Sequence, residues 1–522
     1  MNSFIQQYQK KVTGILSGFD RLIFKGSLRY LQHTPGMMDF LYSKDILLKD
    51  FGPFADKITK ELREASKIEA KTQGRPIKYI SSSMARKDLI AKEIAAADGI
   101  EEGLICILTC VEPCKSFEIH KNRELKVLSI ERRDRKCLHL YHYWMDPDFG
   151  FMHGRIQTWF PFTIRVYING REWLSRELKK RNINYIKKEN CFVKIDDVEK
   201  AQNIMNEQLK TNWPEVLQNI VNKLNPIHDE IFSDFLIDYF WATYQSEWAT
   251  DIMFTSQRQL DKIYPQLIRG AISTFSSEDV MRFLGKRTRG HGFHGEVVST
   301  LHNRPEGVRI KHQVKKNSVK MYNKEGQILR VETTINDPRD FKVLRKKQGD
   351  EYGKKECLKM RKGIADLYAR AQVSDASNKR YIEALASFNT RKTIAELVSP
   401  ICKANKLNNK RVRPIRPWEE GDKLLLQTAN NGDYVLTGFR NRDLFAVFNA
   451  PVKKISGTEK KRNKARITRQ IRILRGHGIV KKVAHSHRYL VTSRGRKIIS
   501  AILAYIQISL EMMNNILVEG YS

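Results

Sequence analysis

The chain has 522 residues, 41% of them hydrophobic, which is enough for two to four domains. Lysine and arginine outnumber aspartate and glutamate by 93 to 58, and the net charge of +35 favours a polyanionic partner, nucleic acid first. The seven cysteines are too few for a disulfide framework, and no run of about 18 apolar residues predicts a membrane span. Because the N-terminus is also too polar for a signal peptide, we expect a cytoplasmic protein that enters no membrane.

The first predicted domain covers residues 1–235 and mixes helices with strands. Residues 2–17 look helical, and "GFDRLIFKGSLRYL" then predicts a strand and a turn. Strand patterns dominate residues 104–168, and two helical patterns around "CFVKI" close the segment. The cysteines of "CILTCVEPC" lie four residues apart, which is not the spacing of a zinc knuckle, so we interpret them as reduced core residues.

Two further segments precede a boundary. Residues 236–345 form a second α+β segment, with a strand in "SEWATDIMF", a helix in "SQRQLDKIYPQLIRGAIS" and hairpins after it. Residues 346–404 look mostly helical, and 405–420 form a basic linker that contains proline. No internal repeat is evident. The predicted fold class is therefore multidomain α+β, with two mixed segments, a helical connector and a C-terminal winged helix.

The C-terminal segment, residues 421–522, contains an amphipathic basic helix from about residue 463 to 475. Ile467, Ile471 and Leu474 recur at helical spacing and form an apolar stripe. Glycine ends the helix, and a hairpin of "IVKKV" and "RYLVT" follows. The cations outside the stripe are the candidate nucleic-acid contacts: Lys464, Arg466, Arg469 and Arg472 on the helix, and Lys481, Lys482 and Arg488 on the hairpin.

Residues 435–505, with the pattern "ITRQIRILRGHGIVKKV…HRYLVT", resemble a winged helix-turn-helix of bacterial regulators and replication initiators. The resemblance implies duplex DNA as a partner, with the helix in the major groove and the wing on the backbone. The alternative is a winged helix that serves protein contacts.

The stretch from Lys316 to Phe341, "KNSVKMYNKEGQILRVETTINDPRDF", predicts a hairpin with one charged face. Strand alternation places Lys320, Tyr322 and Lys324 together on the first strand. On the return strand Arg330 and Glu332 share a face that we expect to be too charged for the core, while the other face is apolar.

The loop of this hairpin decides whether the two charged sets meet. A three-residue loop, residues 325–327 with Gly326 in the left-handed conformation, places Tyr322 opposite Arg330 and Lys320 opposite Glu332. A two-residue loop would place Tyr322 opposite Leu329, which mixes the polar and apolar faces. We therefore predict the three-residue loop.

The pattern Lys-x-Tyr-Asn-Lys…Arg-Val-Glu, residues 320–332, resembles a stretch of the replication initiators of rolling-circle plasmids and filamentous phages. The resemblance implies nicking of one DNA strand with a tyrosine and a divalent metal. A His-hydrophobe-His metal motif is missing, since "HLYH" and "HGFH" space their histidines by three, and so is the glycine-rich serine motif of the plasmid family. Tyr322 is therefore a candidate nucleophile on local chemistry alone, with Arg330 and Glu332 beside it, while Lys320 and Lys324 would hold phosphates.

Glu247 and Asp251 are the candidate metal ligands. A spacing of four places both on one face of the strand "SEWATDIMF", near the hairpin if one sheet holds both. Oxygen ligands of this kind suit Mg²⁺ or Mn²⁺. The alternative is a pair of carboxylates that neutralise neighbouring arginine and lysine.

These patterns predict a nucleic-acid-binding protein of a replicon or mobile element. The most specific hypothesis is a metal-dependent DNA strand-nicking replication initiator or a transposase-like enzyme, acting on duplex or single-stranded DNA. The alternative is a non-catalytic transcriptional regulator or a protein that binds structured RNA.

Overall fold

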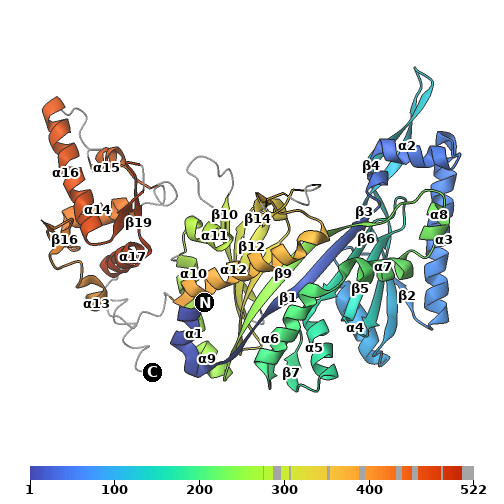
Figure 1. Cartoon of the computed structure of the whole chain (residues 1–522), viewed down its shortest axis with the longest axis horizontal. Coiled ribbons are helices and arrows are strands. Elements are labelled where there is room, and N and C mark those ends of the chain that lie inside the picture. Colours follow the sequence, from blue (N-terminus) through green and yellow to red (C-terminus); the bar gives the residue numbers. More distant parts are fainter. Residues whose placement is uncertain are drawn as a thin grey trace.

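A mixed sheet of eleven strands dominates the computed structural model (Figure 1). In spatial order its strands are β10 (Val297–Arg304), β11 (Gly307–Val314), β12 (Asn317–Lys324), β13 (Ile328–Ile335), β9 (Phe240–Phe254), β1 (Val12–Ser27), β6 (Ile164–Asn169), β5 (Gly150–Gln157), β4 (Val127–Asp146), β3 (Gly103–Asn122) and β2 (Ile77–Tyr79). Neighbouring strands are antiparallel except β2 and β3. The residues that the structure describes are 1–273, 275–285, 296–304, 307–347, 349, 353–354, 356–386, 394–430, 438–448, 456–483 and 486–507.

The sheet consists of two halves with the same topology. The long strands β1 and β9 lie side by side at its centre. Each is followed by helices and later by four antiparallel strands, β3 to β6 after β1 and β10 to β13 after β9. The first half also has the short strand β2, which pairs parallel to β3 and has no counterpart in the second half. The last of these four strands, β6 in one half and β13 in the other, returns to pair with the long strand of its own half. The segments predicted as separate domains, 1–235 and 236–345, therefore share one sheet.

Helices cover one face of the sheet almost completely. Phe24 of β1 packs its ring against Trp213, and Thr333 of β13 donates a hydrogen bond to Asn378 on the same face. The helices on this face are α1 (Asn2–Tyr8), α2 (Thr34–Ser43), α3 (Phe51–Thr72), α7 (Trp213–Leu224), α8 (His228–Phe232), α9 (Gln257–Asp261), α10 (Tyr264–Ser273), α11 (Ser277–Phe283) and α12 (Leu367–Leu385).

The other face is only partly covered. The elements on it are α4 (Lys87–Ala97), α5 (Gly170–Lys180), α6 (Val198–Glu207) and the hairpin of β7 (Tyr185–Lys188) and β8 (Cys191–Ile195). Beyond them, strand residues alternate between buried and half-buried, as Leu22 and Phe24 do with Arg21, Ile23 and Lys25. We call the half-buried side the open face: Arg21, Ile23, Lys25, His153, Arg155, Arg165, Tyr167, Arg309, Lys311, Lys320 and Tyr322.

The N-terminus departs from the predicted helix over residues 2–17. The helix α1 ends at Tyr8, and β1 begins at Val12. The segment "VTGILS" is apolar and β-branched, and it pairs with β9 from its first residue. Strand pairing at the centre of a large sheet thus outweighs the local helical pattern.

The C-terminal elements have their own apolar core, which contains Ile415, Leu426, Phe439 and Ile499. In chain order they are α13 (Ile394–Val398), β16 (Asn405–Leu407), β17 (Lys410–Val412), α14 (Glu420–Ala429), α15 (Asn441–Phe448), α16 (Gly457–Gly476), β18 (Val480–Lys482), β19 (Tyr489–Val491) and α17 (Ser493–Gln507). A bridge from Phe439 to Tyr489 adds a third short strand to β18 and β19. The helices α14, α15 and α16 therefore precede the hairpin of β18 and β19 in the chain.

Two details of the C-terminal prediction have different outcomes in the structure. The stripe of Ile467, Ile471 and Leu474 is buried as predicted. The linker expected over 405–420 instead forms the hairpin of β16 and β17, and Ile415 enters the core.

A further pair of strands, β14 (Lys342–Arg345) and β15 (Glu356–Lys359), lies outside the main sheet. None of the helices in the described ranges is long and apolar enough to cross a membrane.

We predict that residues 394–507 fold in isolation, whereas 435–505 do so less stably. The shorter fragment lacks α14 and the buried side chain of Ile415, so it loses part of the apolar core. Thermal unfolding of both fragments, followed by circular dichroism, measures the difference. A cooperative transition at the same temperature in both fragments would contradict this assignment of the core.

Candidate functional site

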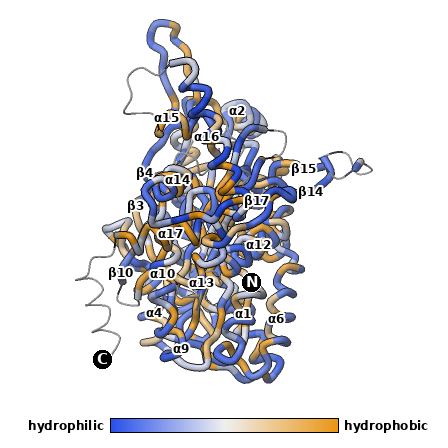
Figure 2. Tube along the Cα trace, turned by 90° about the vertical axis from the view of Figure 1, so that its left-hand side faces the viewer, coloured by the Kyte–Doolittle hydropathy of each residue, from blue (hydrophilic) through white to orange (hydrophobic). Residues whose placement is uncertain are grey.

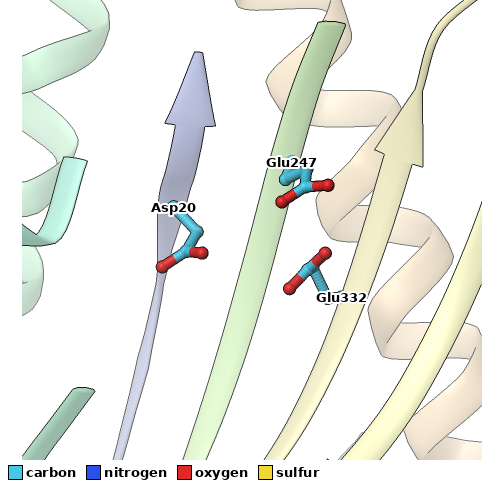
Figure 3. Close-up of side chains that lie close together, drawn as sticks. All are labelled: Asp20, Glu247 and Glu332. Atoms are coloured by element: carbon cyan, nitrogen blue, oxygen red, sulfur yellow. The ribbon is translucent and has the colours of Figure 1, made fainter. Parts of the chain in front are cut away.

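Three buried carboxylates meet at the centre of the open face. Asp20, Glu247 and Glu332 come from the adjacent strands β1, β9 and β13, and each is at most 5% exposed. One oxygen of each lies within 4.8 Å of the others (Figure 3). We call these residues the carboxylate cluster.

A β-bulge brings Asp20 to this cluster. Phe19 lies opposite Trp248 and Arg21 lies opposite Glu247, so Asp20 is the extra residue between two regular pairs. A bulge redirects the side chain of the extra residue. The backbone here is also closely packed, because a Cβ atom on Gly170 would lie 2.0 Å from the carbonyl oxygen of Phe19.

The predicted register of the hairpin is confirmed. Tyr322 lies opposite Arg330, Lys320 lies opposite Glu332, and three residues connect the strands. Gly326 has a φ of 70°, in the left-handed region. The apolar side of the hairpin is buried as expected: Met321, Leu329 and Val331.

The expectation that the charged side is too polar for the core was wrong. Arg330 is 0% exposed and Glu332 is 2% exposed. Burial is tolerated because each charge has an opposite partner at hydrogen-bond distance, as the buried ion pairs of proteins require.

Arg330 bridges two aspartates from different strands. Its Nε and Nη2 donate to the two carboxylate oxygens of Asp251 at 2.5 and 2.8 Å, and its Nη1 donates to Asp20 at 3.0 Å. Its Nη2 also donates to the backbone oxygen of Asn190, in the turn between β7 and β8, at 2.8 Å. The amide of Asn190 in turn donates to both oxygens of Asp20 at 3.0 Å.

Arg171 closes the network from the first turn of α5. The side chain of Asn169 caps this helix by accepting hydrogen bonds from the backbone N–H groups of Arg171 and Glu172. The cap fixes the first turn of α5 against the open face of the sheet. There the guanidinium of Arg171 lies 3.2 Å from Asp251 and donates to the backbone oxygen of Ala249 at 3.1 Å.

Lys320 and Tyr322 contact the cluster from the open side. Lys320 Nζ lies 2.7 Å from Glu332 and 3.3 Å from Glu247. The hydroxyl of Tyr322 donates to the other oxygen of Glu332 at 2.8 Å, and Arg21 lies 3.6 Å from Glu247. Tyr322 is only half-buried, so it lies between the cluster and solvent.

Charge and burial move the pKa values of these groups in different directions. Burial raises the pKa of Glu332, but Lys320 and Arg330 outweigh it and bring the pKa down to about 2. Burial and the charge of Glu332 together raise the pKa of Glu247, despite Lys320 and Arg21. Burial lowers the pKa of Lys320, but the two glutamates outweigh this effect and leave it raised.

Tyr322 is not held as a phenolate. Burial and the negative charge of Glu332 raise the pKa of Tyr322 well above its ordinary value, although Arg330 acts in the opposite sense. The cations near this tyrosine are already paired with carboxylates, so they stabilise those carboxylates rather than the phenolate.

Glu247 and Asp251, the two predicted metal ligands, have different partners in the structure. Glu247 belongs to the carboxylate cluster, whereas Asp251 is engaged by Arg330 and Arg171. Asp20, which the sequence reasoning missed, joins Glu247 and Glu332 instead. A single acidic residue inside the apolar run "GFDRLIF" was the available signal.

The predicted phosphate contacts also differ in their surroundings. Lys320 is bound to the cluster, and Lys324 donates to the side chain of Asn190 and lies 3.5 Å from Glu189.

The histidines of "HLYH" are buried, and those of "HGFH" lie outside the described residues.

The C-terminal candidates lie on the surface of α16 and the wing. Arg488 is half-buried, and the remaining candidates are exposed: Lys464, Arg466, Arg469, Arg472, Lys481 and Lys482. Arg462, Arg466 and Arg469 line a surface cavity of about 880 Å³ along α16. Figure 2 shows the hydrophilic character of the N-terminal part of this helix. Arg462, Arg466 and Arg469 therefore share one side of the helix.

No protein-family model, curated protein or solved structure matches this chain.

We predict that Arg330→Met lowers the free energy of unfolding by about 3–5 kcal/mol, because it leaves Asp20 and Asp251 buried without their shared cation. Arg330→Lys keeps the charge and should cost less. Urea denaturation measures both. Arg339→Met, which removes an exposed ion pair with Asp337, is the matched control and should change little. Equal effects at both positions would refute the structural role of Arg330.

Proposed function

We propose that this protein cuts one strand of DNA at the carboxylate cluster, with a divalent cation, and that its winged helix directs it to duplex DNA. A replication initiator or transposase-like enzyme needs both capacities in one chain. The observation that carries the proposal is the convergence of Asp20, Glu247 and Glu332 beside a half-buried tyrosine on an open, basic face.

The donor set fits Mg²⁺ or Mn²⁺. These ions prefer carboxylate oxygens, and the cluster offers three within 4.8 Å of one another. Burial and the charge of Glu332 raise the pKa of Glu247 despite Lys320 and Arg21, and a cation bound at the cluster would offset both effects. Such an ion would polarise a phosphoryl oxygen and neutralise charge that develops there.

Tyr322 and Glu332 form a nucleophile and base pair. The hydroxyl that would attack phosphorus already donates to Glu332 at 2.8 Å, so the proton has an acceptor in place. As the bond from Tyr322 to phosphorus forms, the bond from phosphorus to the ester oxygen of the cut strand breaks; Glu332 takes the tyrosine proton, and the leaving oxygen takes a proton from water. Because the pKa of Tyr322 is raised, the hydroxyl stays protonated in the free protein and gains reactivity only with substrate.

A second candidate is a non-catalytic nucleic-acid binder. The observation that favours it is the pairing of every carboxylate in the cluster: Asp20 with Arg330, Glu332 with Lys320, and Glu247 with Lys320 and Arg21. Such a network stabilises a sheet without any chemistry. A metal would then have to displace Lys320 from its two glutamates.

Cleavage separates the two candidates. We expect the full chain to nick supercoiled plasmid DNA with Mg²⁺ or Mn²⁺, and Glu247→Gln to lower the rate at least about 100-fold by removing a ligand. Tyr322→Phe should abolish both nicking and the covalent protein–DNA adduct while leaving DNA affinity unchanged. Gel electrophoresis with and without protease digestion measures both products.

The control is Glu101→Gln. Glu101 is an exposed carboxylate outside the carboxylate cluster, so this substitution should leave nicking unchanged. Absence of nicking by the parent protein with either metal would favour the non-catalytic binder. Full nicking by the Tyr322→Phe variant would remove the tyrosine from the mechanism.

The proposal for duplex DNA rests on α16. Arg462, Arg466 and Arg469 recur at helical spacing on the exposed side, and an α-helix of this kind fits the major groove. The buried stripe of Ile467, Ile471 and Leu474 holds the opposite side against the domain core, so the cations face outward.

We predict that Arg466→Ala with Arg469→Ala weakens duplex binding of the full chain by about 1–3 kcal/mol per contact that reads a base, and by less per phosphate contact. Fluorescence anisotropy against salt concentration distinguishes the two kinds of contact, because loss of a phosphate contact flattens the salt dependence. Lys403→Ala, outside α16, serves as the control. Unchanged duplex affinity in the double variant would exclude α16 as the recognition helix.

A further inference from the structure

Three cations face one another across three adjacent strands of the open face. Lys25 on β1 lies directly opposite Arg165 on β6, and Arg165 lies directly opposite Arg155 on β5. Like charges in directly opposed positions of a sheet destabilise it. We call this line of residues the cationic row.

The row has little compensation from carboxylates. Arg155 lies 2.9 Å from Glu112, but Glu112 also pairs with Lys87 at 3.2 Å. Within the part of the chain that the structure describes, Lys25 and Arg165 form no ion pair. Burial and the neighbouring cations lower the pKa of both Lys25 and Arg165, the effect expected when an anion is missing.

A cavity of about 260 Å³ lies over the row. Its walls carry five cations, the three of the row together with Lys115 and Arg132, and one carboxylate, Asp134. Asp134 is itself paired with Lys115 at 3.2 Å. The cavity is thus large enough for a phosphate group and has an excess of donors for one.

An exposed aromatic side chain lies beside the row. Tyr244 is 46% exposed, and its ring lies 4.5 Å from the guanidinium of Arg165. A ring next to a phosphate-binding cation is the combination that binds single-stranded nucleic acid, where unpaired bases stack and the backbone is neutralised. A duplex keeps its bases stacked inside and cannot use this ring.

The row lies on the same face as the carboxylate cluster. Lys25 is four residues along β1 from Arg21, which contacts Glu247, so about 13 Å of strand separates them. On the far side of the cluster Lys311 lies directly opposite Lys320, a second pair of like charges. Cations therefore flank the cluster on both sides.

We propose that the cationic row binds the backbone of a single-stranded nucleic acid that crosses the open face, with Tyr244 stacking on a base. The proposal rests on the proposed function in one respect, because it makes this strand the one that reaches the carboxylate cluster. An anion on the row offsets the repulsion that the free protein carries.

The test combines affinity with stability. Lys25→Gln with Arg165→Gln should weaken binding of a fluorescent oligothymidylate by the full chain roughly tenfold and flatten its salt dependence by about 1.4, for two phosphates on a single strand. The melting temperature of the free protein should rise by roughly 1–2 °C, because like charges are removed. Binding is measured with EDTA in the Glu247→Gln background, so that cleavage plays no part.

Matched variants separate this site from general charge loss. Lys60→Gln with Lys71→Gln removes two exposed cations from α3, on the covered face, and should leave single-strand affinity unchanged. The exchange Lys25→Arg with Arg165→Lys keeps the charges and should retain binding. Affinity for a duplex of matched length, held by the winged helix, should be unaffected by the glutamine variant.

The outcomes are distinct. Unchanged oligothymidylate affinity in the glutamine variant would overturn the proposal, as would a lower melting temperature, since the cations would then be held by partners inside the protein. An equal loss of duplex affinity would also overturn it. If the parent protein fails to nick DNA but the row variant behaves as expected, the proposed cleavage fails and the single-strand site stands.

Discussion

The bridge from Arg330 to Asp251 and Asp20 is the interaction on which the rest of the site depends. It joins β13, β9 and β1, and through Asn190 it also holds the hairpin that covers part of the open face. A buried arginine is stable only when its donors are satisfied, and each contact here comes from a different segment of the chain. Once Arg330 is fixed, Glu332, two residues along the same strand, is placed beside Glu247.

The twofold repetition of topology explains why the carboxylates come from distant segments. Each half of the sheet contributes its long strand to the centre, β1 with Asp20 and β9 with Glu247, and the return strand β13 adds Glu332. A site at the junction of the halves cannot form in either one alone. The bulge at Asp20 completes it, because a regular strand would alternate Asp20 away from Arg21, whereas both contact the same group of charges here.

The hairpin could be predicted from sequence because its determinants are local. Strand alternation places Tyr322 and Arg330 on the charged faces of their strands. Gly326 favours the three-residue loop, which brings these two faces together. Asp20 could not be identified as a site residue in this way, because a β-bulge leaves no periodic signal in the sequence. The separation of Asp251 from the cluster depends on Arg171, which approaches from another element far away in sequence. The burial of charge depends on such contacts, and local patterns do not report them.

Charged side chains on the open face are arranged in two different ways. At the centre the carboxylates and cations, Lys320 among them, are paired and buried. On one flank Lys25 and Arg165 are opposed like charges without an ion pair, and on the other Lys311 lies opposite Lys320. A polyanion would therefore gain most of its binding energy on the flanks, where nothing has to be displaced. At the centre a scissile phosphate or a metal must compete with Lys320 for Glu247 and Glu332. Burial and the charges of Lys320 and Arg309 lower the pKa of Lys311, whereas the charge of Glu247 acts in the opposite sense, so the flank and the centre are electrostatically coupled. An anion that drew Lys320 outward would free Glu247 and Glu332 for a cation.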